Sequence, residues 1–140
     1  FTHTFTDVSI ALVTSARKRF GTLYGNHERQ SNVEFTILDV EKPPPANVLQ
    51  SYYLIISSSC IHATQNLGQA CANIDKLLGR DGGILCVLEL TRPLGWLDCV
   101  FGLLDSWWRF DNDRTYPFCS EHKWKSMLLD AGFYQVDWTE

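Results

Sequence analysis

The chain has 140 residues, of which 45% are hydrophobic and 13% aromatic, and its formal net charge at pH 7 is −4. This length predicts one domain, and a chain of this size buries about two thirds of its unfolded surface. The weak negative charge argues against a nucleic-acid partner. No apolar run approaches the roughly 20 residues that a membrane-spanning helix requires.

The cysteines carry a further indication about the type of protein. The five cysteines are Cys60, Cys71, Cys86, Cys99 and Cys119. They form no C-x-x-C pair, and no secretory leader precedes them. We therefore expect no metal site and a reduced, cytoplasmic location.

The first elements in chain order are a strand, a helix and a second strand. Residues 1–6 alternate Phe or His with Thr as far as Asp7, which predicts a strand. Ser9 is suited to cap a helix over residues 10–20. A second alternation predicts a strand that ends at Asp39.

The middle of the chain holds the clearest strand, helix and strand unit. Residues 52–58 contain a short apolar run that is typical of a strand buried on both faces. Apolar residues recur at helical spacing over 67–78, and residues 84–88 predict the next strand, parallel to the previous one. Cys71 and Cys86 fall on apolar faces, and we expect both to be buried.

Aromatic residues dominate the segment that follows. Residues 96–108 carry two adjacent apolar stripes, which predict one amphipathic helix. Core packing and an aromatic lid over a substrate passage both remain open for it, the lid candidates being Trp96, Phe101, Trp107 and Trp108. Ser120 is suited to cap a last helix that Gly132 ends, and residues 134–138 predict a final strand.

Polar residues follow the carboxyl ends of several predicted strands, where ligands of open α/β sheets bind. Asp7 and Asp39 are candidates to bind the ribose of a nucleotide, although an Asp after a strand is often a turn former or a helix cap. His62 and Glu89 are a candidate base and its orienter. The alternative is that His62 caps the next helix and Glu89 pairs with Arg92.

Several short segments together resemble the C-methyltransferase domain of fungal iterative polyketide synthases, especially the non-reducing type. The segments are FTDVS at 5–9, LDVEK at 38–42, IHAT at 61–64, LELTR at 88–92, VFGLL at 100–104 with Trp107 and Trp108, and AGF at 131–133 with VDW at 136–138. The resemblance spans nearly the whole chain. It implies an α/β fold with the Rossmann-like sheet of class I methyltransferases.

The resemblance also implies a chemistry and its partners. The cofactor would be S-adenosylmethionine, held by residues that include Asp7, Asp39, Val40 and Ser58. The substrate would be a β-ketoacyl chain linked through phosphopantetheine to an acyl carrier protein, next to neighbouring synthase domains. The catalytic dyad of the family falls on His62 and Glu89.

The chain departs from the family pattern in three respects. The first strand with its Gly-rich loop is absent, as is the last strand, so the resemblance implies the C-terminal portion of one methyltransferase domain, with a lid-like insert at about 93–119. Tyr53 stands where relatives usually carry Asp, and Ser59 where they often carry Asn. Because strand edges are left unpaired, we expect the 140 residues alone to be marginally stable, to bind the cofactor poorly and to be inactive.

Two other functions stay open. A nicotinamide-dependent oxidoreductase would use a similar sheet, but the chain contains neither a Tyr-x-x-x-Lys pair nor a G-x-G-x-x-G motif. The other is a non-catalytic methyltransferase-like domain that packs within a polyketide synthase.

Overall fold

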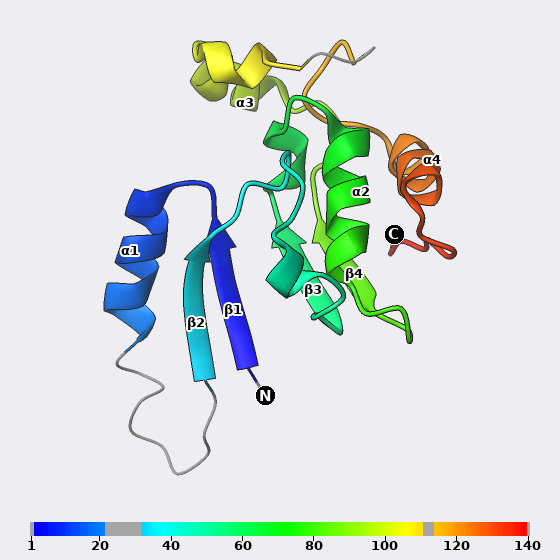
Figure 1. The fold of residues 1–140 in the computed structure, drawn as a ribbon. Coiled ribbons are helices and arrows are strands. Elements are labelled where there is room, and N and C mark those ends of the chain that lie inside the picture. The colour runs from blue at the N-terminus through cyan, green and yellow to red at the C-terminus, as the bar shows by residue number, and fades with distance from the viewer. Residues whose placement is uncertain (1, 22–31, 111–113, 140) are drawn as a thin grey trace. The chain divides into compact units, whose positions relative to one another are not determined.

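The computed structural model describes residues 2–21, 32–110 and 114–139. Its contacts divide the chain into two compact units, Phe1–Asp39 and Val40–Glu140. Each unit contains one pair of parallel strands, β1 with β2 and β3 with β4 (Figure 1).

The first unit has the predicted order of strand, helix and strand. Strand β1 (Thr2–Asp7), helix α1 (Ile10–Phe20) and strand β2 (Asn32–Ile37) confirm the expected elements, while Phe1 lies outside the described residues. The Ser9 hydroxyl accepts a hydrogen bond from the Leu12 N–H, as expected of a helix cap. The parallel register brings the rings of Phe5 and Phe35 to 6.1 Å between centroids.

The second unit contains the predicted parallel pair with its crossover helix. Strand β3 (Leu54–Ser58) pairs with β4 (Ile84–Leu88), and helix α2 (Leu67–Leu77) connects them. The Asn66 side chain caps α2, and the Ser120 side chain caps α4 (Glu121–Ala131). Helix α4 packs against α2.

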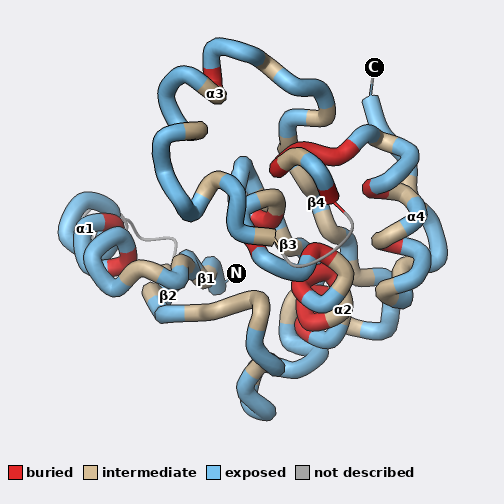
Figure 2. The backbone as a smooth tube through the Cα atoms, turned by 90° about the horizontal axis from the view of Figure 1, so that it is seen from above, coloured by how far each residue is buried: buried red, intermediate tan, exposed pale blue. Residues whose placement is uncertain are grey.

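The core of this unit lies along α2. Figure 2 shows the buried residues gathered on α2 and in the segment before α4. Leu67, Cys71 and Ile74 of α2 pack with Trp124 and Leu128 of α4, and Ile55, Leu85 and Val87 of the strands contact the same cluster. The prediction that Cys71 is buried is confirmed.

Two expectations about burial in the strands are wrong. Successive residues of a strand point to opposite faces, and the helices of this unit cover only one face of β3 and β4. The other face is exposed, and its residues are Leu54, Ile56, Ile84, Cys86 and Leu88. Strand β3 is therefore not buried on both faces, and Cys86 is not buried.

The predicted helix over 96–108 is interrupted. Helix α3 (Gly95–Phe101) ends at Gly102, and a separate 3₁₀ turn, η3 (Asp105–Trp108), follows. The Trp108 indole N–H donates to the Gly102 carbonyl oxygen at 2.9 Å. In a continuous helix that oxygen would accept from the N–H of residue 106, so the indole replaces the helical bond at a residue of low helix propensity.

The predicted strand over 134–138 does not form. The segment after Gly132 runs without regular structure as far as the described residues extend, to 139, and pairs there with neither β3 nor β4. A strand needs a hydrogen-bonded neighbour, and alternation of side chains does not supply one. Among the described residues, no helix is both long and apolar enough to cross a membrane.

Candidate active site

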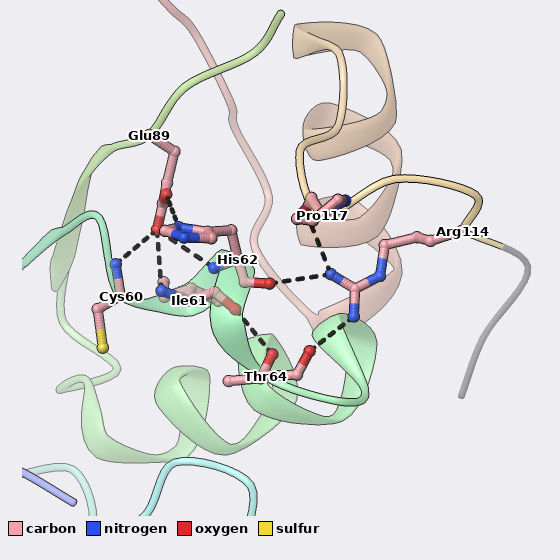
Figure 3. Close-up of polar contacts among 7 residues, drawn as sticks. All are labelled: Cys60, Ile61, His62, Thr64, Glu89, Arg114 and Pro117. Carbon is pink, nitrogen blue, oxygen red and sulfur yellow. Dashed lines mark hydrogen bonds and ion pairs between the residues drawn. The ribbon is translucent and has the colours of Figure 1, made fainter. Parts of the chain in front are cut away.

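His62 and Glu89 are in direct contact. The Nδ1 atom of His62 lies 2.6 Å from Oε2 of Glu89, and the side chains are 14% and 2% exposed (Figure 3). His62 comes from a 3₁₀ turn, η2 (Ile61–Ala63), that follows β3, and Glu89 follows β4 directly. Because β3 and β4 are parallel neighbours, the residues after their carboxyl ends meet at one edge of the sheet.

The backbone of the turn holds the Glu89 carboxylate. Oε1 accepts hydrogen bonds from the N–H groups of Cys60, Ile61 and His62, at 3.0, 2.8 and 3.3 Å (Figure 3). A carboxylate at the amino end of a helical turn satisfies donors that the turn itself leaves unpaired. Both oxygens of Glu89 thus face the segment that carries His62, rather than Arg92.

This arrangement determines which imidazole nitrogen is available for chemistry. A carboxylate only accepts, so in the neutral ring the proton resides on Nδ1 and is donated to Oε2. Nε2 then carries the lone pair. The pair therefore has the geometry of a general base with an orienting carboxylate.

Aromatic rings border the imidazole. The ring centroid of Phe118 lies 5.2 Å from that of His62, and the centroid of Trp107 lies at 6.4 Å, both in edge-to-face orientation. Trp107 also stacks on Phe101, with centroids 5.3 Å apart. Two of the four lid candidates, Phe101 and Trp107, thus belong to the cluster beside His62.

The other two lid candidates, Trp96 and Trp108, are not among the described rings that contact His62. Trp96 is 63% exposed. Trp108 is also exposed, and its ring contacts that of Tyr116 with centroids 6.3 Å apart. Its indole N–H donates to the Gly102 carbonyl oxygen.

Asp98 links the aromatic residues to one another. Its Oδ1 accepts hydrogen bonds from the Tyr116 hydroxyl at 2.7 Å and from the Trp107 indole N–H at 3.2 Å. Desolvation, the hydrogen bond to Asp98 and the negative charge of Asp98 all raise the pKa of Tyr116 above its ordinary value. The raised pKa favours the protonated hydroxyl, which is the form that donates to Asp98.

The sequence did not single out Arg114 and Phe118, which both lie at the site. The Arg114 side chain donates to backbone carbonyl oxygens of His62, Thr64 and Pro117 (Figure 3). It also donates to that of Gln65, and the residue is only 9% exposed. The signal that could have found it is a lone arginine beside the aromatic and proline residues 116–118. Such a cation requires buried acceptors.

The cofactor-binding candidates fall into both units. In the first unit, Asp7 is the last residue of β1, where it pairs with Ile37, and Asp39 follows β2. Oδ1 of Asp7 accepts from the Ser9 N–H at 2.7 Å, which is the contact of a turn-forming Asp. In the second unit, the Val40 carbonyl oxygen accepts from the Asn73 side chain at 2.9 Å, and Ser58 is exposed at the end of β3.

A cavity of about 790 Å³ lies at the opposite end of the β3–β4 pair. Its lining includes Leu78, Gly79, Ile84 and Phe133 but neither His62 nor Glu89. Within the described parts of the chain, no group of three His, Cys, Asp or Glu side chains is arranged to hold a metal ion.

Comparisons with known proteins identify the family of the chain. Over 140 residues, the whole chain, it is 77% identical to the non-reducing polyketide synthase dpfgA of Gibberella zeae, and it spans 6% of the length of that relative. The solved CMeT domain of the citrinin polyketide synthase matches with a TM-score of 0.89 and 36% identity, covering 98% of this chain and 34% of that one. The trans-methyltransferase CalH, solved with SAH, matches with a TM-score of 0.78 and 31% identity over 94% of this chain and 36% of that one. No family model matches the chain.

The fold is that of a class I methyltransferase, in truncated form. Within that class, the chain belongs to the C-methyltransferase domains of fungal non-reducing polyketide synthases. The expected fold and family are therefore confirmed.

Proposed function

We propose that this chain carries the catalytic base of an S-adenosylmethionine-dependent C-methyltransferase, which methylates a β-ketoacyl chain on an acyl carrier protein of a polyketide synthase. The observation that carries the proposal is the 2.6 Å contact between Nδ1 of His62 and Oε2 of Glu89. The family of the chain supports the reaction type, because its solved relatives include a polyketide-synthase CMeT domain.

In this proposal His62 removes a proton from the substrate. A carbon between a ketone and a thioester carbonyl is acidic enough for a positioned imidazole to deprotonate, and imidazole accepts protons near neutral pH. Nε2 takes the proton, and the imidazolium that results is stabilised by Glu89 through Nδ1. The hydrogen bonds from the backbone N–H groups of Cys60 and Ile61 keep the Glu89 carboxylate in place during this change.

The residues of the first unit fit a nucleoside cofactor by the chemistry of their side chains. Asp7 ends one parallel strand and Asp39 lies just beyond the other, at the carboxyl ends where carboxylates accept hydrogen bonds from ribose hydroxyls. In the second unit, Val40 and Ser58 are the proposed further contacts. When bound, S-adenosylmethionine supplies an electrophilic methyl group for the carbanion that His62 generates.

The test is product analysis of the intact synthase that carries this chain, with His62→Ala. Loss of the base should lower the rate of methylation by about 10²- to 10⁴-fold. The matched control is His122→Ala, because His122 lies on α4, where its ring contacts Trp138. Unchanged methylation in His62→Ala would favour a structural role for the chain instead.

A further inference from the structure

We propose that Arg114 is a positioning residue that holds the turn carrying His62 in its reactive geometry. The inference rests on the proposed function, since it assigns Arg114 a role through His62 and no contact with substrate. It starts from a separate set of contacts, on the side of the turn opposite to Glu89.

The guanidinium of Arg114 donates hydrogen bonds to carbonyl oxygens at the end of the turn that carries His62. Nη1 donates to the His62 carbonyl at 3.1 Å and to the Pro117 carbonyl at 3.4 Å. Nη2 donates to the carbonyls of Thr64 and Gln65, at 2.6 and 2.9 Å. The arginine therefore fastens the turn to the segment before α4, about fifty residues further along the chain.

Two opposite charges thus hold the two ends of one turn. The Glu89 carboxylate accepts hydrogen bonds from the N–H groups at the start of the turn, from Cys60 to His62. The Arg114 guanidinium donates hydrogen bonds to the carbonyl oxygens at its end. Each charge has the sign that the dipole of a helical turn favours at that end. His62 lies between them, so the position of its imidazole is set by both.

The shape of the guanidinium explains why an arginine is suited to this role. Its planar fork presents several N–H groups at fixed angles and reaches the carbonyls of His62, Thr64 and Gln65 at once. The ring of Phe110, whose centroid lies 5.0 Å from the guanidinium carbon, packs on its face. A lysine would keep the charge but offers a compact ammonium, which does not reproduce the fork.

The expected consequence of losing Arg114 is a misplaced base. The turn stays attached through Glu89 at its start, but its end is released. Because small displacements of reacting groups have large effects on rate, Arg114→Met should lower kcat for methyl transfer by about 10- to 100-fold. The affinity for S-adenosylhomocysteine should change by less than about two-fold, since none of the four carbonyls that Arg114 holds belongs to a candidate cofactor residue.

The experiment uses the intact synthase with Arg114→Met, Arg114→Lys and Arg114→Ala, and Arg17→Met as the matched control. Arg17 also donates to a backbone carbonyl, that of Phe35 at 2.8 Å, but it belongs to the first unit. Each variant is measured for kcat, for S-adenosylhomocysteine affinity and for melting temperature. Arg114→Ala is also assayed with added guanidinium chloride at concentrations that leave the wild-type rate unchanged.

The proposal expects a low kcat in Arg114→Met and Arg114→Lys with near-normal cofactor affinity, a normal kcat in Arg17→Met, and partial recovery of Arg114→Ala by guanidinium. It is overturned if kcat stays normal, or if it falls only in proportion to the loss of folded protein and guanidinium restores nothing. His62→Ala separates this result from the proposed function. If His62→Ala retains methylation, the proposed function itself fails, whatever Arg114 does.

Discussion

The N–H of Ser59 donates to the carbonyl oxygen of Leu88 at 2.8 Å, one residue beyond the end of β3. This bond extends the parallel ladder of β3 and β4 and brings the backbone after Leu88 beside Cys60. The Glu89 carboxylate then accepts a hydrogen bond from the N–H of Cys60. Ser59 has a φ of 49°, in the left-handed region, and the chain turns there into the segment that carries His62. The dyad therefore depends on a backbone conformation that serine rarely adopts.

Replacing Ser59 by Asn should stabilise the methyltransferase domain that contains this chain. Asn tolerates the left-handed region better than Ser, so we expect the free energy of unfolding to rise by about 0.5 to 1 kcal/mol. Urea denaturation measures the change. Gln50, whose φ is 53°, is a matched position, and Gln50→Asn should act in the same direction. A lower stability of both variants would show that the left-handed backbone does not limit stability at these positions.

Glu89→Gln should damage both catalysis and the turn. The amide keeps the volume of the side chain but loses the charge that three backbone N–H groups and the His62 ring share. We expect methylation to slow by at least about 10²-fold. The comparison is Glu121→Gln, because Glu121 is a carboxylate on α4 that accepts from the Thr91 hydroxyl instead. Equal rates for the two variants would contradict the role given to Glu89.

Adjacent residues of β3 should respond differently to truncation. In the 140-residue chain, Ile55→Ala removes a side chain that packs against the core cluster and should cost about 2 kcal/mol of unfolding free energy. Ile56 is 72% exposed on the other face, so Ile56→Ala should change stability by less than about 0.5 kcal/mol. Chemical denaturation of the two variants checks this difference. Similar losses would mean that the face of Ile56 is covered.

Burial of Cys71 should make the chain sensitive to alkali. Desolvation raises the pKa of the Cys71 thiol from 9.0 to about 11. The unfolded chain loses this proton first, so stability is complete below pH 9.0 and declines as the pH rises towards about 11. The loss should reach about 2 kcal/mol, seen as the difference between wild type and Cys71→Ala in unfolding measured across this range. Parallel pH curves for the two proteins would disprove it.

Local sequence determined most of the helices and strands. The caps Ser9 and Ser120 and the period of apolar residues predicted α1, α2 and α4 and the four strands, because hydrogen bonds near in sequence and side-chain periodicity act within one element. His62 and Glu89 could be chosen as a pair once the strands were predicted. Each follows a strand, and parallel strands end at one edge of a sheet.

Only the tertiary structure decided what depends on partners distant in sequence. The expected helix over 96–108 breaks where the Trp108 indole takes the Gly102 carbonyl, the segment 134–138 remains unpaired, and one face of β3 and β4 is left exposed. Arg114 acquires its role solely because folding brings it to carbonyls about fifty residues earlier in the chain. A propensity describes what a residue favours alone, whereas burial and hydrogen bonding are settled by the groups that folding places beside it.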